Sequence, residues 1–469
     1  MKMSTTKLPT RVIGLIIACA VLITFALLPD SGSFTHQGWL SIGLLLTLAV
    51  MWITTPIPLG ATGLLILVLI LLLGIAPNWA GATGGFANNA VFFAVAIFCL
   101  PVVVMKTKWG IRLVGWLVER VHENSRKLIL LFMITCALLS TVLSDFCVTI
   151  IFYGFALTIL KAANADPAHS NLGKCLMIGI PVAAVIGGMA TPVGGNFNIL
   201  AISTMEQATG TGVSFLEWMA IGLPIAAVMV PIAWFFLTLA FKPEPIEDRF
   251  LTEIREEAAA AKDIDGFDVK AGAVIILTLI AWVVSSFVPV LDPTMVTIIA
   301  LALMMLPGLD LINFKEVQQQ VPWDIVIIIG TIISLGMVVM QTGAAKAMAE
   351  VLMATGLTGW DVIPMCLFIF AFIYLLHTFF PIGAAIIAIF VPITIPLFAA
   401  IGVSAVVPTV AIAICVAGNF LLPFNPTVAL TFGQGYYKAG EMVKFGIGPA
   451  ICLVVLMSLW IPLISGLFA

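Results

Sequence analysis

Long apolar runs fill the chain and are separated by short polar segments. Runs of about 17–25 residues, the length that crosses a bilayer as a helix, recur from end to end. We predict eleven crossings, at 11–29, 38–54, 57–76, 86–105, 173–200, 216–241, 268–290, 295–313, 323–342, 404–432 and 445–468. The sequence therefore predicts an all-α polytopic membrane protein.

Two further apolar stretches are interrupted in the middle. The stretch 127–160 is broken by Ser144-Asp145, and the stretch 359–401 by Phe380-Pro381-Ile382-Gly383. Each half is short for a complete crossing and ends at a polar or Pro/Gly tip, so we predict two re-entrant hairpins.

The charge pattern supports this threading. With the N-terminus in the cytoplasm, nineteen of the twenty Lys and Arg residues lie on the cytoplasmic side and only Lys346 lies outside. That partition obeys the positive-inside rule, and counting either hairpin as one crossing would destroy it. The C-terminus is then outside. Short loops favour a bacterial inner membrane, and the first run lacks a cleavage pattern, so we expect a retained first helix.

The order of elements occurs twice. Three crossings, a short amphipathic stretch, a hairpin and two crossings follow one another in both halves, and the odd number of crossings makes the copies inverted. We predict an N-terminal tail and first helix at 1–37, an inverted repeat at 38–241, a cytoplasmic linker at 242–267 and a second inverted repeat at 268–469.

Composition excludes a soluble protein and a nucleic-acid binder. Only 9% of the residues are charged, against roughly 25% in soluble domains, and no basic tract is interleaved with aromatic residues. The eight cysteines lie in apolar segments without metal-ligand spacing, which is typical of small core residues.

Two predicted crossings carry helix-breaking residues at corresponding places. They read "GGMATPVGGNFNILA" at 187–201 and "AGNFLLPFNPTVALTFGQG" at 417–435. Irregular backbone at membrane depth is tolerated where it lines a cavity or is buried in protein. The breaks indicate either a binding site at mid-membrane depth or kinks packed against neighbouring helices.

With these motifs, the chain resembles the divalent anion/sodium symporter family, the sodium-coupled dicarboxylate, citrate and sulfate carriers. The segments 214–234 and 321–343 and both modules of hairpin and broken helix carry the resemblance, which covers nearly the whole chain. It implies a homodimer whose transport domain moves like an elevator against a scaffold. It also implies a Ser-Asn-Thr motif at each hairpin tip.

The first tip departs from that motif because Ser144-Asp145-Phe146 stands in its place. Ser140 and Ser144 still lie on one helical face, as the family's first sodium site requires. Ser140, Ser144, Asp145 and the Gly194 carbonyl offer the hard oxygen ligands that Na⁺ prefers. Asp145 could hold Na⁺ or a proton, or serve only as a hydrogen-bonding group at a helix N-terminus.

The second tip has lost its side-chain oxygens, since Pro381-Ile382-Gly383 replaces the motif. His377 nearby is a candidate second cation or proton site, or a residue that only bonds a neighbouring carbonyl. No Lys or Arg falls within the predicted membrane depth, so helix N-termini and polar side chains must hold an anionic substrate. The candidate substrate-binding residues are Ser144, Asp145, Asn196, Asn198, Asn425 and Thr427.

These features predict a secondary active transporter of di- or tricarboxylates such as succinate, malate, tartrate or citrate, coupled to Na⁺ or H⁺ at the first tip. A cation-independent exchanger and a sulfate carrier remain alternatives within transport. A channel is disfavoured by the inverted repeats with broken helices. An intramembrane enzyme is disfavoured because four histidines occur without HExxH or GxSxG motifs.

Overall fold

The computed structural model describes residues 8–120, 124–167, 169–246, 256, 259, 264–288, 290–356, 359–379, 383–423 and 425–466. Helices account for all regular structure within these ranges, apart from one isolated bridge between Ser31 and Phe34. The predicted linker lies largely outside the described residues, as do Phe424 and the second hairpin tip at 380–382. The all-helical prediction is confirmed.

The helices of the first half begin with α1 (Leu8–Ala26), α2 (His36–Thr54), α3 (Leu59–Leu72), α4 (Trp79–Ala82), η1 (Gly84–Ala87), α5 (Asn89–Ile97), α6 (Leu100–Lys106) and α7 (Trp109–Glu119). They continue with α8 (Ser125–Ser140), α9 (Asp145–Ala162), α10 (Asn171–Gly188), α11 (Asn196–Thr209) and α12 (Phe215–Ala240).

The second half runs through α14 (Gly266–Ser285), α15 (Pro293–Met304), α16 (Phe314–Gln320), α17 (Trp323–Gln341), α18 (Ala344–Ala354), α19 (Val362–Phe379), α20 (Gly383–Ala399), α21 (Val406–Ala417), α22 (Pro426–Phe432) and α23 (Ala439–Ser465).

Eight helices within the described ranges are long and apolar enough to span a membrane. Seven lie in predicted crossings, and the eighth is α19, the first arm of the second predicted hairpin. The other predicted crossings form shorter apolar helices such as α3 and α15, or the interrupted pair α21 and α22. The polytopic architecture is confirmed, although several helices are shorter than the apolar runs because turns and caps take up their ends.

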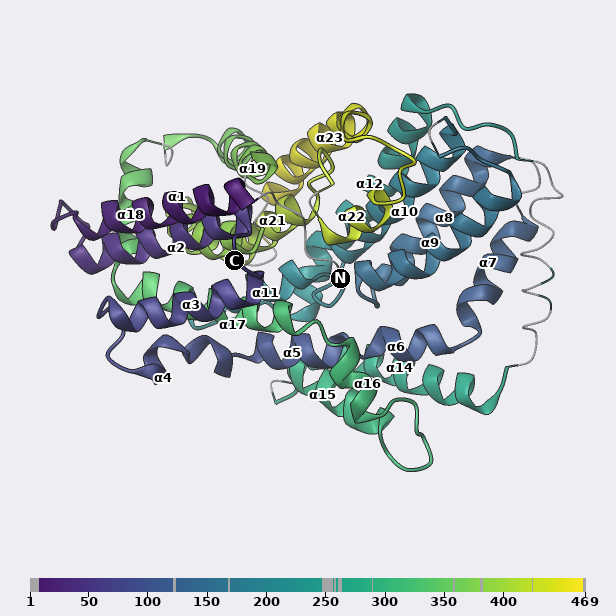
Figure 1. The fold of residues 1–469 in the computed structure, drawn as a ribbon, viewed down its shortest axis with the longest axis horizontal. Coiled ribbons are helices and arrows are strands. Elements are labelled where there is room, and N and C mark those ends of the chain that lie inside the picture. Colours follow the sequence, from purple (N-terminus) through teal and green to yellow (C-terminus); the bar gives the residue numbers. More distant parts are fainter. Residues whose placement is uncertain are drawn as a thin grey trace.

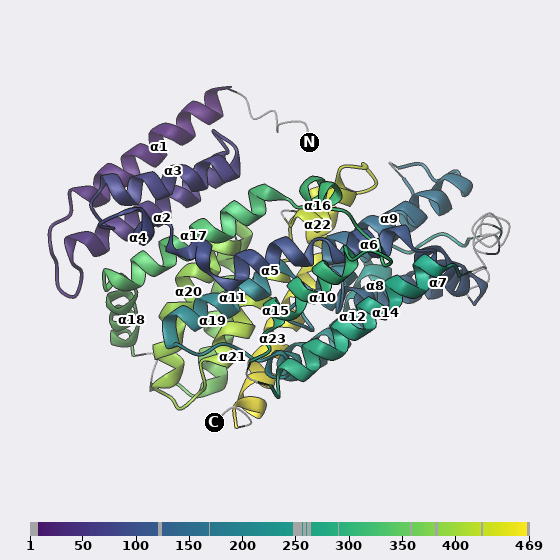
Figure 2. The same ribbon diagram turned by 90° about the horizontal axis from the view of Figure 1, so that it is seen from below.

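The helices gather into two groups with a central region between them. In Figure 1, α1–α3 and α18 lie at one end and α7–α10 at the other, with α5, α11 and α21 between them. Figure 2, turned by 90°, shows the same division. Both predicted helix breaks are present: α10 ends at Gly188 before α11 starts at Asn196, and α21 ends at Ala417 before α22 starts at Pro426.

Helix α10 is the buried centre of the second group. It packs against both arms of the first hairpin, and 89% of its span is buried, compared with 39% for α14. Small residues allow this close approach, since a Cβ at Gly187 would lie 2.1 Å from the carbonyl oxygen of Ala137 on α8. The backbone of the first break is thereby held directly beside the end of α8.

Candidate functional site

The first hairpin turns between α8 and α9, and Asp145 is the first residue of α9. Its backbone N–H donates to the Gly194 carbonyl at 3.2 Å, so the tip is joined to the first helix break. Its carboxylate accepts from the Phe146 N–H at 2.7 Å and from the Ser144 hydroxyl at 3.4 Å. The charge therefore sits in the first turn of a helix, where the dipole favours it.

The first break is held in shape by two polar side chains. The Asn198 amide donates to the carbonyls of Gly188 and Thr191, at 2.7 and 2.8 Å. The Thr191 hydroxyl donates to the Thr141 carbonyl at 2.6 Å and accepts from the Gly194 N–H at 3.2 Å. These bonds replace the helical bonds lost at the break, as buried backbone groups require.

Ser140 supplies an unsatisfied oxygen beside this break. Its hydroxyl is fully buried and has no hydrogen-bond partner within the part of the chain that the structure describes. A Cβ at Gly194 would lie 2.6 Å from the carbonyl oxygens of both Ser140 and Gly188, so these oxygens converge. An orphaned hydroxyl beside converging carbonyls is a donor set that fits a hard cation such as Na⁺.

The second half of the chain reaches the same tip through α22. The Thr427 side chain lies beside the Asp145 carboxylate, and α22 contacts α9. Asn425 caps α22, because its side-chain oxygen accepts from the Thr427 N–H at 2.9 Å. The tip of the first hairpin therefore touches the second broken helix as well as the first.

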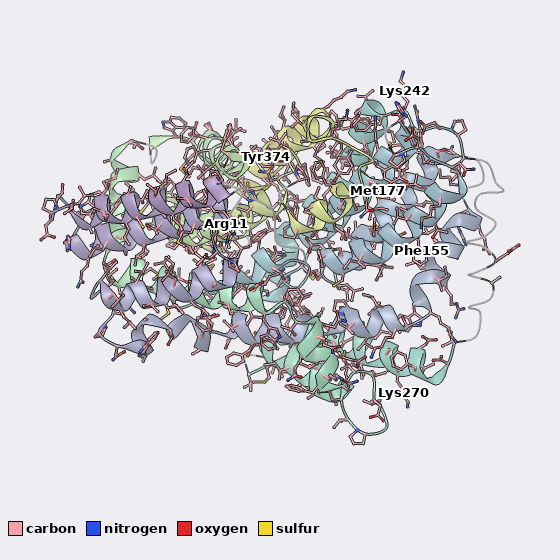
Figure 3. The ribbon with its side chains drawn as sticks, in the orientation of Figure 1. Arg11, Phe155, Met177, Lys242, Lys270 and Tyr374 are labelled. Carbon is pink, nitrogen blue, oxygen red and sulfur yellow. The ribbon has the colours of Figure 1, made fainter. Side chains whose placement is uncertain are left out.

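The second break is closed differently. The Tyr374 hydroxyl of α19 donates to the Gly418 carbonyl at 2.8 Å and accepts from the Phe420 N–H at 2.9 Å. Asn419 donates to the Thr378 hydroxyl at 3.0 Å. Figure 3 shows Tyr374 where α19 approaches α21 and α23. A phenol thus occupies the Gly418 carbonyl, which a cation could otherwise contact, and satisfies the Phe420 N–H.

The structure brings most of the predicted site residues together. Ser140, Ser144, Asp145, Gly194 and Thr427 surround the first tip, whereas Asn198 acts on the backbone of the break and keeps only its side-chain oxygen unpartnered among described residues. Asn196 begins α11 and is half-buried.

His377 lies apart from the first tip, in the last turn of α19. Its ring lies beside the Val416 backbone, while Nδ1 has no partner in the described ranges. Both predicted roles of His377, as a cation or proton site and as a residue that only bonds a neighbouring carbonyl, stay predictions.

Sequence reasoning missed two residues of the site. Thr191 hydrogen-bonds within the first break and Tyr374 within the second. Neither side chain is charged or an amide, and we selected candidates in the apolar runs by those two properties. The Thr-Pro step within the first break was the one local signal for Thr191. Tyr374 gave none, because its partner lies 44 positions further along the chain.

Comparison with known proteins places the whole chain in one family. The model of the sodium:sulfate symporter transmembrane region matches residues 9–466. A membrane protein of Cupriavidus necator is 24% identical, over 95% of this chain and 91% of that protein. The sodium-dependent dicarboxylate transporter SdcS of Staphylococcus saprophyticus is also 24% identical, over 96% and 90%.

Two solved structures share the fold. The YdaH transporter of Alcanivorax borkumensis superposes with a TM-score of 0.55 at 13% identity, covering 98% of each chain. MtrF of Neisseria gonorrhoeae gives 0.54 at 14% identity, covering 96% of this chain and 95% of that one. The chain therefore belongs to the sodium:sulfate symporter family, and it is a membrane transporter and not an enzyme.

Proposed function

We propose that this protein carries small dicarboxylate or tricarboxylate anions, driven by Na⁺ bound at the tip of the first hairpin. The observation that carries the proposal is the buried hydroxyl of Ser140, which has no partner among described residues and lies beside converging carbonyls, at the end of the helix that leads to Asp145. The sodium-dependent dicarboxylate transporter among its relatives supports both the ion and the substrate class.

The electrostatics explain why cation and anion would bind together. The N-terminus of α9 favours negative charge, but the Asp145 carboxylate already occupies it. A dianion arriving there would be repelled until a cation neutralises the carboxylate. Binding of Na⁺ to Ser140, Ser144, Asp145 and the Gly194 carbonyl would therefore be a condition for substrate binding, which is the essence of coupled transport.

The anion would contact the remaining polar groups near the tip. The candidates are Asn196 at the start of α11, the side-chain amides of Asn198 and Asn425, and the Thr427 hydroxyl. Two of them already hold backbone groups, since Asn198 bonds two carbonyls and Asn425 caps α22. We therefore expect Asn198 and Asn425 to act chiefly by shaping the site, with Asn196 facing the substrate and the Thr427 hydroxyl joining it once a cation has neutralised Asp145.

Cation-independent exchange is the second candidate, and one observation favours it. Tyr374 satisfies the Gly418 carbonyl and the Phe420 N–H of the second break, so these two groups need no cation. His377 would then be a structural residue. If the first cation site also bound Na⁺ only weakly, the protein would exchange anions without a cation gradient. A sulfate carrier is a variant of the leading proposal with a smaller dianion.

The wider mechanism is part of the same proposal. The matched element series on either side of the linker supports inverted repeats at 38–241 and 268–469, and the hairpins and breaks would move together as an elevator within a homodimer. The basic residues support an N-terminus in the cytoplasm, a C-terminus outside and a bacterial inner membrane as the location.

Uptake into proteoliposomes tests the proposal. Labelled succinate, citrate and sulfate would be offered with an inward Na⁺ gradient, with an inward H⁺ gradient, or with neither but with unlabelled dicarboxylate inside. We expect carboxylate uptake that requires Na⁺. Uptake with H⁺ alone would make Asp145 a proton carrier, and uptake only against internal dicarboxylate would establish the exchanger. Uptake of sulfate alone would refute the carboxylate assignment.

A further inference from the structure

The amphipathic helix α7 lies at one end of the molecule, between the first hairpin and α14 (Figures 1 and 2). Its first turn is fixed: a Cβ at Gly272 of α14 would lie 2.3 Å from the Trp109 ring, and one at Gly110 would lie 3.5 Å from Ile151 of α9. One face of α7 borders an open hollow.

This hollow has a volume of about 420 Å³ and is lined by Trp109, Arg112, Leu113, Trp116 and Ile264. Four of these side chains are apolar or aromatic, and one is a cation. Trp116 is 48% exposed and Ile264 is 51% exposed, so the hollow faces the surroundings of the protein. A matching ligand has an apolar part and an anionic group at one end.

Arg112 supplies the unsatisfied polar group. One guanidinium nitrogen, Nη1, is buried and lacks a hydrogen-bond partner in the described part of the chain. Among the described residues, Asp265 and Asp268, which follow Ile264 in the chain, are engaged by Lys108. Asp265 accepts from Lys108 Nζ at 3.3 Å, and Asp268 accepts from the Lys108 N–H at 3.0 Å. A buried, unpaired guanidinium N–H is costly, and phosphate oxygens match its geometry.

A second positive charge stands beside the hollow. The Arg120 guanidinium lies 3.8 Å from the centre of the Trp116 ring and also donates to the Trp116 carbonyl at 3.0 Å. Stacking fixes this cation next to the lining aromatic residue. Tryptophan and basic residues together are typical of the boundary between lipid headgroups and acyl chains.

We propose that the hollow on α7 binds one anionic membrane phospholipid, with its phosphate on Arg112 and its glycerol and upper acyl chains against Trp116 and Ile264. Charge complementarity selects this occupant, because a zwitterionic lipid would bring its own cation toward Arg120. The site is separate from the transport site and does not depend on the proposed substrate. Bound lipid would anchor α7, which connects α6 to the first hairpin.

Native mass spectrometry of the intact, detergent-purified protein tests this proposal. Phosphatidylglycerol and phosphatidylcholine would be titrated into wild type, Arg112→Gln and a control, Arg126→Gln. Arg126 lies in the first turn of α8, and its backbone carbonyl accepts from the Trp234 indole N–H at 3.0 Å, a bond that the substitution leaves in place. We expect phosphatidylglycerol to bind wild type more tightly than phosphatidylcholine does. We also expect about tenfold weaker binding to Arg112→Gln and less than about a twofold change for the control.

Two further measurements keep the outcome decisive. Arg112→Lys keeps the charge without the planar fork and should bind with intermediate affinity, which rules out misfolding as the cause of any loss. Inorganic phosphate in place of lipid should not compete at equal concentration, because it lacks the apolar part. Equal losses in Arg112→Gln and Arg126→Gln, equal affinity for both lipids, or full competition by phosphate would each overturn the proposal.

Discussion

Replacing Asp145 by asparagine tests the coupling site directly. The asparagine oxygen can still accept the Phe146 N–H, so the turn should keep its shape while the charge disappears. Opposite charges about 4 Å apart attract by about 4 kcal/mol at an effective dielectric of 20. If desolvation offsets half of this, the loss is about 2 kcal/mol, which weakens Na⁺ binding about thirtyfold.

Two assays would measure that loss. The first is the Na⁺ concentration that gives half-maximal succinate uptake in proteoliposomes. The second is the rise in melting temperature with added Na⁺, which reports binding even when transport is lost. Asp324→Asn is the matched control, because Asp324 lies in the first turn of α17 and outside the site. An unchanged Na⁺ dependence in Asp145→Asn by both assays would refute the assignment.

Gly194→Ala should abolish uptake and lower the melting temperature, because its Cβ would lie 2.6 Å from two carbonyl oxygens. In the control Gly195→Ala the new Cβ would lie no closer than 3.5 Å to another atom, so uptake and melting temperature should be retained. Tyr374→Phe should lower the free energy of unfolding by about 2–4 kcal/mol, because two buried backbone groups lose their hydrogen-bond partner. The loss is measured as a lower melting temperature, and an unchanged melting temperature would contradict this prediction. The Lys106 ion pair lowers the pKa of Glu316, so its stabilisation is present above the usual carboxyl pKa and is lost as pH falls through the lowered value. Glu316→Gln should therefore reduce the loss of unfolding free energy at acidic pH. If the unfolding free energy of Glu316→Gln fell with pH as steeply as that of wild type, the Lys106–Glu316 pair would not contribute.

Sequence periodicity and composition were enough for the architecture. A bilayer requires long apolar helices with satisfied backbone groups, so run lengths predict the spans. The orientation inferred from the Lys and Arg residues stays a prediction. A carboxylate inside such a run is costly, which is why the sequence alone marks Asp145 as a candidate functional residue. Gly and Pro likewise predicted both helix breaks, at 187–201 and 417–435.

Tertiary structure decided which polar groups remain free. Ser140 and Asn198 are both buried side chains in the first half of the chain. The Ser140 hydroxyl has no hydrogen-bond partner among described residues, whereas the Asn198 amide donates two hydrogen bonds to backbone carbonyls. The contact of Thr427 with Asp145 and the bond of Tyr374 to Gly418 join distant segments. No local pattern encodes such pairings, because hydrogen-bond satisfaction depends on how separate helices meet. The sequence by itself therefore determined the membrane fold and marked the first tip, and packing alone determined which buried oxygens there lack a hydrogen-bond partner among described residues.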